Sequence, residues 1–432
     1  MTCEIRLHRT LLFLLLIVSM ADGQDRLYVV QYGDESLAEI RLETGAVNPH
    51  VLDLGYGCND IIAHGSRLFV TNSLLNTVQE IDAETDVTLR DIPTTGGVNP
   101  HSAATLNSDT LAVTNWISNN VLLIRLSSGQ VVGNVYVGVA PQGIVAHGDR
   151  VYVCLTRYLP SGQYGPGVVM IYNRGDFHLL DSLRVGMNPQ TAAVDEWDRL
   201  HVVCTGNYGT VGGEIHVVDL GNRQTEAVVE VGGSPSNISF GGGQALLAAG
   251  GWGDHGEVYR YRLDDLTVLN DQASPIRVGS GATDVEALAD GSFFVSCAMT
   301  DEVEHRSNAG ALFNRYPVSD GPGQMVLYGG ESPIQPVVPR LVARESAIRE
   351  AYPNPSNGSV RFRLSASLTE PSIILIYNSI GQIVARLPVG TGRQEVGWQW
   401  DRDRVNPLAT GTYYAILDDG RGGRAYPIVL MK

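Results

Sequence analysis

The segment Asn59–Thr85, NDIIAHGSRLFVTNSLLNTVQEIDAET, decides the expected fold because its pattern returns along most of the chain. It has a polar start, an apolar run that ends in a turn, and two further runs separated by a second turn. Further copies begin at Pro100, Pro141, Pro189, Pro235 and Ala282, and successive copies start 41, 41, 48, 46 and 47 residues apart. A regular spacing of this kind indicates a repeat architecture.

The runs within each copy predict strands rather than helices. They are short, rich in β-branched and aromatic residues, and bounded by Gly, Asn, Asp or Ser, which is typical of strands. Examples are LFVTN (68–72), LAVTN (111–115), VYVCL (151–155), LHVVC (200–204) and FFVSC (293–297). No segment of this region keeps a helical period of apolar residues over three turns. Strand repeats of about 40 to 50 residues are typical of four-stranded propeller blades, so we predict an all-β propeller.

The start of the repeat region predicts how the ring closes. Residues 27–57 contain the second, third and fourth runs of a unit and lack the first. A propeller closes when one blade takes strands from both ends of the chain, which removes the exposed sheet edges. We expect the missing inner strand within Ser332–Leu341 (SPIQPVVPRL). The sequence thus predicts a seven-bladed β-propeller over residues 24–341.

The LFVTN and LAVTN runs, with the Pro-x openings of the units, resemble the YVTN or YncE-like family of seven-bladed β-propellers. The first position of the run is often Leu here, where the family has an aromatic residue. The resemblance implies a fold and a binding platform rather than a particular chemistry, because members of this fold differ in function.

The C-terminal region predicts a second domain. A linker at residues 342–350 precedes residues 351–432, whose alternating runs are separated by turn residues and predict a small, Ig-like β-sandwich. Its motifs resemble the type A sorting domain of the type IX secretion system; they are Tyr352-Pro353-Asn354-Pro355, Ile376-Tyr377-Asn378, Trp400-Asp401, Thr410-Gly411-Thr412-Tyr413-Tyr414 and the terminal Lys432. Ser356 and Arg402 depart from the usual family pattern. The resemblance implies the type IX secretion machinery as a partner.

The N-terminus predicts export. Residues 1–23 carry basic residues, a ten-residue apolar run and Ala21-Asp22-Gly23, the layout of a secretory signal peptide. No other stretch is long and apolar enough to span a membrane. Together with the sorting-domain resemblance, this predicts a bacterial protein that passes the periplasm and is secreted or placed on the outer cell surface.

Composition excludes several function classes. The formal net charge of −16 argues against a nucleic-acid partner. Lys432 is the only lysine, so Schiff-base chemistry and a P-loop are excluded from the folded body. After Cys3, four cysteines remain, at 58, 154, 204 and 297, and three of them lie in apolar runs. We therefore expect buried free thiols rather than disulfides.

Candidate site residues come from aligning the six units. The links between blades and the turns between second and third strands lie on one face of a propeller, around the central channel. The position after each blade start is polar in every unit, and the predicted ring is Asp60, His101, Gln142, Gln190, Ser236 and Asp284. The matching turns contribute a predicted rim of Asn72, Asn115, Trp116, Arg157, Tyr158, Asn207, Tyr208, Trp252 and Thr300. We predict a ligand pocket there; the alternative is that these residues line a water-filled channel.

Three functional hypotheses remain open from the sequence. The leading one is a secreted binding module for an unknown surface ligand or protein, with no assigned catalytic residue, metal or cofactor. The alternative is an enzyme, such as a lactonase-like hydrolase or a quinoprotein-like dehydrogenase, with Asp60, His101 and Asp284 around a metal or cofactor. A third is a scaffold that binds through its outer blade edges.

Overall fold

The computed structural model describes residues 26–329, 348–364, 372–377, 383–400, 408, 410–418 and 426–431. The chain forms two compact units, residues 1–336 and 337–432, which are described separately. The predicted signal peptide, residues 342–347 of the predicted linker, the Ser332–Leu341 segment and Lys432 lie outside the described residues. Within those described, no helix has the length and apolar character that crossing a membrane requires.

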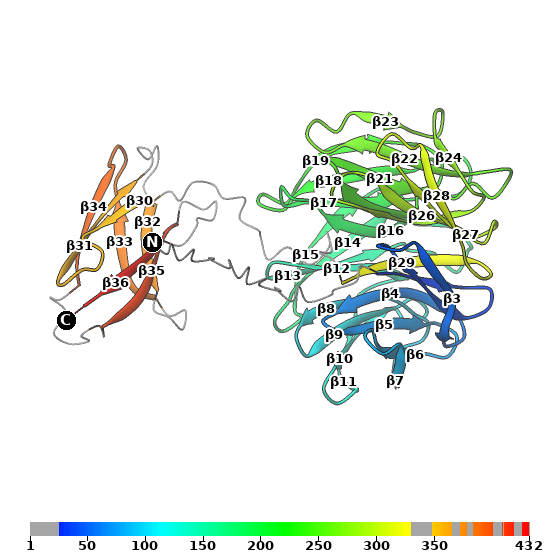
Figure 1. The fold of residues 1–432 in the computed structure, drawn as a ribbon, viewed down its shortest axis with the longest axis horizontal. Helices are drawn as coiled ribbons and strands as arrows, with labels where there is room; N and C mark the ends of the chain where they lie inside the picture. The colour runs from blue at the N-terminus through cyan, green and yellow to red at the C-terminus, as the bar shows by residue number, and fades with distance from the viewer. Residues whose placement is uncertain are drawn as a thin grey trace, which may run out of the picture. The chain divides into compact units, whose positions relative to one another are not determined.

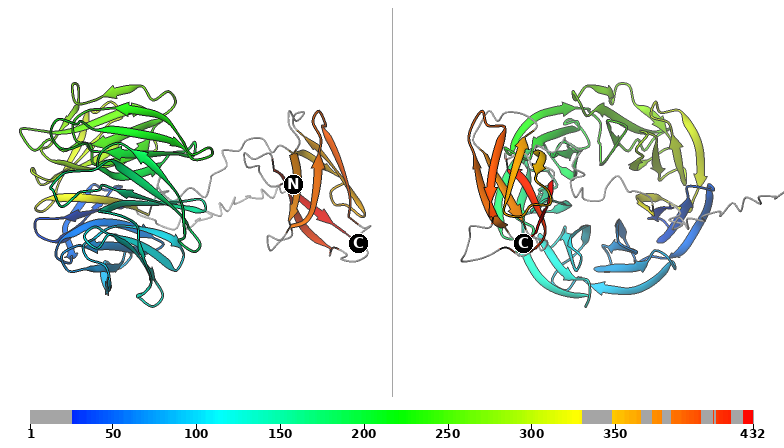
Figure 2. Two further views of the ribbon diagram at one scale, coloured as in Figure 1. Left: turned by 180° about the vertical axis from the view of Figure 1, so that it is seen from behind. Right: turned by 60° about the vertical axis from the view of Figure 1, so that its left-hand side comes forward.

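The first unit is a seven-bladed β-propeller (Figures 1 and 2). Seven antiparallel sheets stand around a common axis, and each inner strand packs against the inner strand of the next blade, so the ring is closed. From the axis outward, blade 1 contains β29 (Pro322–Tyr328), β1 (Arg26–Gln31), β2 (Ser36–Arg41) and β3 (Ala46–Asp53), and blade 2 contains β4 (Cys58–His64), β5 (Arg67–Asn72), β6 (Thr77–Asp82) and β7 (Val87–Pro93). Blade 3 contains β8 (Pro100–Asn107), β9 (Thr110–Asn115), β10 (Asn120–Arg125) and β11 (Gln130–Tyr136), and blade 4 contains β12 (Pro141–His147), β13 (Arg150–Leu155), β14 (Gly167–Asn173) and β15 (Leu179–Val185).

The remaining blades have the same order, except that two short strands share the outer position of blade 6. Blade 5 contains β16 (Pro189–Val194), β17 (Arg199–Cys204), β18 (Glu214–Asp219) and β19 (Gln224–Glu230). Blade 6 contains β20 (Asn237–Gly241), β21 (Gln244–Ala248) and β22 (Gly256–Arg262), with β23 (Val268–Asn270) and β24 (Ile276–Val278) at its outer position. Blade 7 contains β25 (Ala282–Ala287), β26 (Phe293–Cys297), β27 (Glu302–Arg306) and β28 (Leu312–Pro317).

Burial explains why the second strand of each blade gave the clearest sequence signal. In β5, every residue from Leu68 to Asn72 is buried, because neighbouring blades cover both faces of the sheet. The outer strand β11 instead alternates between exposed and half-buried residues. The core is accordingly divided into seven apolar layers, each between two neighbouring blades.

The threonine of the repeated VTN sequence has a specific role at the inner strands. Thr71 Oγ1 accepts a hydrogen bond from the Asp60 N–H at 3.1 Å, at a β-bulge in its own blade. The same hydroxyl donates to the His101 carbonyl of the next blade at 2.8 Å. Thr114 repeats the arrangement with the Ser102 N–H at 3.0 Å and the Gln142 carbonyl at 2.6 Å. Each threonine thus joins two blades.

The strand that closes the ring is β29, which corrects the prediction of Ser332–Leu341. Residues 322–328 pair with β1, where Arg26 lies opposite Tyr328 and Leu27 opposite Leu327. Met325 and Leu327 are buried between blades 7 and 1. Pro322 is the next Pro-x opening in the series, 40 residues after Ala282.

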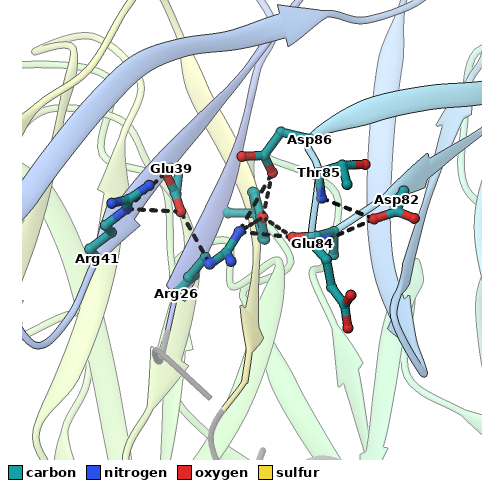
Figure 3. A network of polar contacts seen from close by, with 9 residues as sticks. Arg26, Glu39, Arg41, Asp82, Glu84, Thr85 and Asp86 are labelled. Atoms are coloured by element: carbon teal, nitrogen blue, oxygen red, sulfur yellow. Dashed lines mark hydrogen bonds and ion pairs between the residues drawn. The ribbon is translucent and has the colours of Figure 1, made fainter. Parts of the chain in front are cut away.

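A polar network joins the closing blade to blade 2 (Figure 3). The Arg26 side chain lies 3.3 Å from the buried Glu39 carboxylate and donates to the Ala83 carbonyl at 2.8 Å. The Tyr28 hydroxyl donates to Asp86 Oδ1 at 2.7 Å. Since Ala83 and Asp86 lie in the turn between β6 and β7, these bonds hold the two blades together at the closure.

The second unit is a β-sandwich. One sheet contains β30 (Ile348–Tyr352), β31 (Ser359–Leu364) and β34 (Glu395–Gln399), and the other contains β33 (Ile383–Val389), β32 (Ser372–Tyr377), β35 (Gly411–Asp418) and β36 (Tyr426–Leu430). Side chains from both sheets, such as Phe362 and Ile376, form one apolar core. Strand β30 begins at Ile348, within the predicted linker. The Ig-like topology stays a prediction.

The cysteine prediction is confirmed for the four cysteines that the structure describes. Cys58, Cys154, Cys204 and Cys297 are free and buried. Burial raises the pKa of each thiol, so these groups are protonated at neutral pH and act as small apolar side chains.

The closure generates a prediction about the end of the propeller. A chain that ends at Gly329 retains β29 and is expected to unfold cooperatively at a temperature close to that of a chain ending at Leu341. A chain that ends at Gly321 lacks β29, exposes the inner edge of β1 and loses the buried Met325 and Leu327. We expect it to unfold at a clearly lower temperature or not to fold. Scanning calorimetry of the three chains checks this, and equal stability of all three would contradict it.

Candidate functional site

The candidate site is one face of the propeller, here called the mouth face. It is formed by the links between blades and by the turns between second and third strands, and backbone hydrogen bonds join the two kinds of loop. The Ser73 N–H donates to the Gly57 carbonyl at 2.8 Å, the Trp116 N–H to Asn99 at 2.9 Å and the Met299 N–H to Ser280 at 3.0 Å. The remaining turns form the opposite face.

The predicted ring residues occupy two different positions on the inner strands. His101, Gln142 and Gln190 come directly after the first residue of their strands, as Ser236 comes after Pro235. Asp60 and Asp284 lie one position further along, opposite Thr71 and Ser296. The offset arises because these two blades open without a proline: Cys58 lies opposite Asn72 as Pro100 lies opposite Asn115, and blade 7 opens at Ala282.

Asp60 and Asp284 connect adjacent inner strands. Asp60 accepts from the Ile61 N–H at 2.9 Å and from the Ala103 N–H of the next blade at 3.2 Å. Asp284 accepts from the Val285 N–H at 2.8 Å and from the Met325 N–H of the next blade at 2.6 Å. Their carboxyl oxygens are therefore already used in holding the ring together.

Burial changes the ionisation of the central side chains. It raises the pKa of Asp60 to about 6 and that of Asp284 to about 7. Glu286, two residues further along β25, also has a pKa raised well above its usual value, by burial and by the Asp284 charge. Burial lowers the pKa of His101 to about 4, so this imidazole is neutral at neutral pH. The centre of the ring therefore carries less negative charge than its composition suggests.

Two of the predicted ring residues form a contact across blades. The Gln142 side-chain amide donates to the neutral His101 Nε2 at 3.0 Å. The buried His101 Nδ1 and Gln142 Oε1 have no hydrogen-bond partner within the described part of the chain. Gln190 donates to the Tyr208 hydroxyl, and Ser236 donates to the Ala248 carbonyl at 3.3 Å.

Asn72 and Asn115 correct the prediction of an exposed rim. Both end their second strands and are fully buried. Asn72 Nδ2 donates to Thr77 Oγ1 at 3.3 Å, and Asn115 Nδ2 donates to the Val113 carbonyl at 3.0 Å. The alignment of the turns predicted both for the rim, whereas each packs beneath a glycine of the blade link, where a Cβ would clash.

The other predicted rim residues lie on the mouth-face loops. Asn207 is half-buried and accepts the Val211 N–H at 2.8 Å, which orders its own loop. Arg157 donates to the Pro166 carbonyl at 3.3 Å. Trp252 is 65% exposed, and Thr300 lies in the turn after β26.

An aromatic cluster extends over blades 3 to 5 and consists of Trp116, Tyr158, Tyr164 and Tyr208. The Trp116 and Tyr158 rings stack with centroids 5.8 Å apart. Tyr164 lies 5.1 Å from Tyr158 and 6.3 Å from Tyr208. Tyr164 is absent from the predicted rim; the unusual length of the 156–166 loop was the available signal, because a loop that folds back brings distant residues together.

Exposed apolar side chains are distributed unequally between the two faces. Eleven large apolar side chains are exposed on the mouth-face loops, and they are Tyr32, Tyr56, Leu74, Leu75, Val98, Ile117, Tyr158, Tyr208, Val211, Trp252 and Met299. In the opposite-face loops of the described propeller Trp197 is the only one, and the Arg199 guanidinium covers its ring at 4.8 Å. Concentration on one face is typical of an interaction surface.

The metal hypothesis gains no geometric support. Among the described residues, no group of three or more His, Cys, Asp and Glu side chains is arranged to hold a metal ion. Asp60, His101 and Asp284, from blades 2, 3 and 7, therefore do not form such a group.

The predicted sorting-motif residues lie in the second unit. Tyr352 ends β30, and both Tyr352-Pro353 and Asn354-Pro355 are cis peptide bonds. Asn354 Oδ1 accepts the Val429 N–H at 2.8 Å. Ser356, a departure from the family pattern, is buried and accepts from the Trp400 indole at 3.1 Å. Gly411 begins β35, and Tyr413 is buried in the core.

Comparisons with known proteins support the fold. No family profile and no curated protein matches the chain. A proposed 6-phosphogluconolactonase from Bacteroides uniformis is similar in structure, with a TM-score of 0.56 at 11% identity, covering 70% of this chain and 99% of its own. A functionally unknown protein from Desulfotomaculum acetoxidans gives 0.53 at 13% identity, covering 70% and 98%. Apo AztD from Citrobacter koseri gives 0.50 at 11%, covering 71% and 99%.

At these identities the likeness shows the fold alone. The chain is therefore an all-β protein with a β-propeller. Membership of the YVTN or YncE-like family stays a prediction, as does the sorting-domain resemblance.

The buried carboxyls generate a pH prediction. An unfolded aspartate titrates near pH 4, whereas the pKa of Asp284 in the fold is about 7. Between these values the folded chain binds more protons than the unfolded chain, so this contribution to stability is complete below pH 4 and is lost as the pH rises to 7. Asp284→Asn cannot titrate, and we expect its free energy of unfolding to fall less between pH 5 and pH 8. Urea unfolding at several pH values measures this.

Asp254→Asn is the control, because Asp254 is an exposed loop carboxyl. The comparison uses the slope against pH, so a constant loss of stability caused by the substitution does not affect it. Identical slopes for the parent and Asp284→Asn would contradict the raised pKa.

Proposed function

We propose that this protein is a binding module whose mouth face holds a partner. The observation that carries the proposal is the unequal distribution of exposed apolar side chains between the loops, eleven on the mouth-face loops against Trp197 alone on the opposite-face loops of the described propeller. Exposed apolar side chains lose their unfavourable contact with water when a partner covers them. The closed ring holds the loops on a rigid support, which reduces the ordering cost of binding.

The other two hypotheses receive less support. The shared fold with a proposed 6-phosphogluconolactonase is compatible with an enzyme, yet at 11% identity it carries no chemistry to this chain. The Asp60 and Asp284 carboxyls already accept backbone N–H groups. Binding through outer blade edges is compatible with exposed residues such as Tyr136 and Phe313, and cross-linking from an outer strand separates that case.

We also propose that the protein is exported to the cell surface or medium by the Sec and type IX pathways. Support comes from the signal-peptide pattern at residues 1–23 and from the order of the sorting motifs in residues 351–432. It is consistent with this that the C-terminal region forms a separate compact unit with its own core.

Site-specific photo-cross-linking tests the binding face. A photoreactive amino acid replaces Ile117 on the mouth face, Trp197 on the opposite face or Tyr136 on an outer strand of the full chain, since all three side chains are exposed. In the cells that make the protein, we expect a cross-linked adduct from position 117, because a partner on the mouth face covers this side chain. Adducts from position 136 alone would favour the outer edges, and adducts from position 197 alone would contradict the proposal.

Truncation tests the export route. In a bacterium with a type IX system, we expect the full chain outside the cell and a chain that ends at Leu341 to accumulate in the periplasm. Deletion of the secretion machinery should retain the full chain in the periplasm as well. Immunoblots of periplasmic and external fractions check this, and equal external amounts of both chains would contradict the role of residues 351–432.

A further inference from the structure

Charge divides the mouth face into two parts. The mouth-face loops of blades 6, 7 and 1 contain five acidic residues, which are Asp34, Glu35, Asp254, Asp301 and Asp320. The corresponding loops of blades 2 to 5 contain no Asp or Glu. In a chain with a formal net charge of −16, four consecutive blades without a carboxyl in their mouth-face loops are a clear departure from uniform charge.

The five loop acids are available to a partner. Asp34, Asp254, Asp301 and Asp320 are exposed, and Glu35 is half-buried. None of the five forms an ion pair with another residue in the described ranges. On the opposite face the acid Asp198 pairs with His147 at 2.9 Å. The acidic part of the mouth face, blades 6, 7 and 1, thus carries negative charge that the propeller leaves uncompensated.

The acid-free part carries most of the exposed apolar side chains of the mouth face, while Tyr32, Trp252 and Met299 lie in the acidic part. Blades 2 to 5 hold the aromatic cluster, the exposed aliphatic side chains Leu74, Leu75 and Ile117, and Arg157 as the only charged residue of their mouth-face loops. Tyr208 is 58% exposed and Ile117 57%. Aromatic residues and arginine are the residue types that contribute most to protein interfaces, and tips formed by aliphatic side chains fit a peptide or protein better than a sugar.

We propose that the mouth face binds a bipartite protein segment, in which an apolar and aromatic stretch lies on blades 2 to 5 and a basic stretch lies on blades 6, 7 and 1. This inference rests on the proposed function and adds the chemistry of the partner. The apolar part supplies most of the affinity through burial, whereas the acids select a basic flank and speed up association. Two adjacent parts of different character also fix the direction of the bound segment.

A selection with displayed peptides tests the proposal. The purified full chain is used to select from a phage library of random 16-residue peptides. We expect the enriched peptides to join an aromatic or aliphatic stretch to a stretch of Lys or Arg in a constant order. Synthetic versions of these peptides are then measured by biolayer interferometry at low and high salt.

Three double variants separate the contributions. Tyr158→Ser with Tyr208→Ser removes apolar surface and should weaken binding about tenfold or more at every salt concentration. Asp254→Asn with Asp320→Asn should slow association and reduce the loss of affinity with salt. Glu196→Gln with Trp197→Ser, on the opposite face, is the matched control and should bind like the parent. Circular dichroism melting of each variant shows whether it is folded.

The outcomes distinguish this inference from the function on which it rests. Enriched peptides without basic residues, or no enrichment at all, would overturn the bipartite partner while leaving the cross-linking result to decide the binding face. Binding of neutral glycans on an array, lost in the tyrosine variant, would reassign the aromatic cluster to sugars. Loss of peptide binding only in the control variant would overturn both proposals.

Discussion

The pairing of β29 with β1 is the constraint on which the rest of the propeller depends. Each blade has little core of its own, because its apolar residues are shared with the blades on either side. An open ring would leave the inner edge of β1 unpaired and two apolar layers incomplete. The Arg26, Tyr28 and Asp86 contacts strengthen the same junction and link it to blade 2.

A closed ring allows its loops to differ. The second strands and the threonine bridges repeat with small changes, while the mouth-face turns range from four residues after β9 to eleven after β13. The long turn brings Tyr164 against Tyr158 and Tyr208. Blades of nearly equal construction can therefore carry acidic loops on one part of the mouth and acid-free loops with most of the exposed apolar side chains on the other.

The sequence predicted the features that depend on local pattern and missed those that depend on register and distance. The buried second strands were recognisable because apolar residues fill both faces, as in LFVTN. The offset of Asp60 and Asp284 was not, because blades 2 and 7 open with Cys58 and Ala282 in place of the proline that marks the other openings. Asn72 is buried beneath Gly55, which lies in a different loop. Tyr164 belongs to the aromatic cluster because its ring contacts Tyr208 of the next blade. Such relations depend on the assembled ring.

The antiparallel register of the closing strands also determines how the molecule responds to mechanical force. Arg26 lies opposite Tyr328, and Pro322 lies at the mouth end, so both ends of the propeller chain leave from the face opposite the mouth. If a partner holds the mouth face and a tether pulls on the chain beyond Tyr328, the tension acts along β29. The hydrogen bonds between β29 and β1 then share the load in shear rather than opening one after another, and such a junction resists rupture.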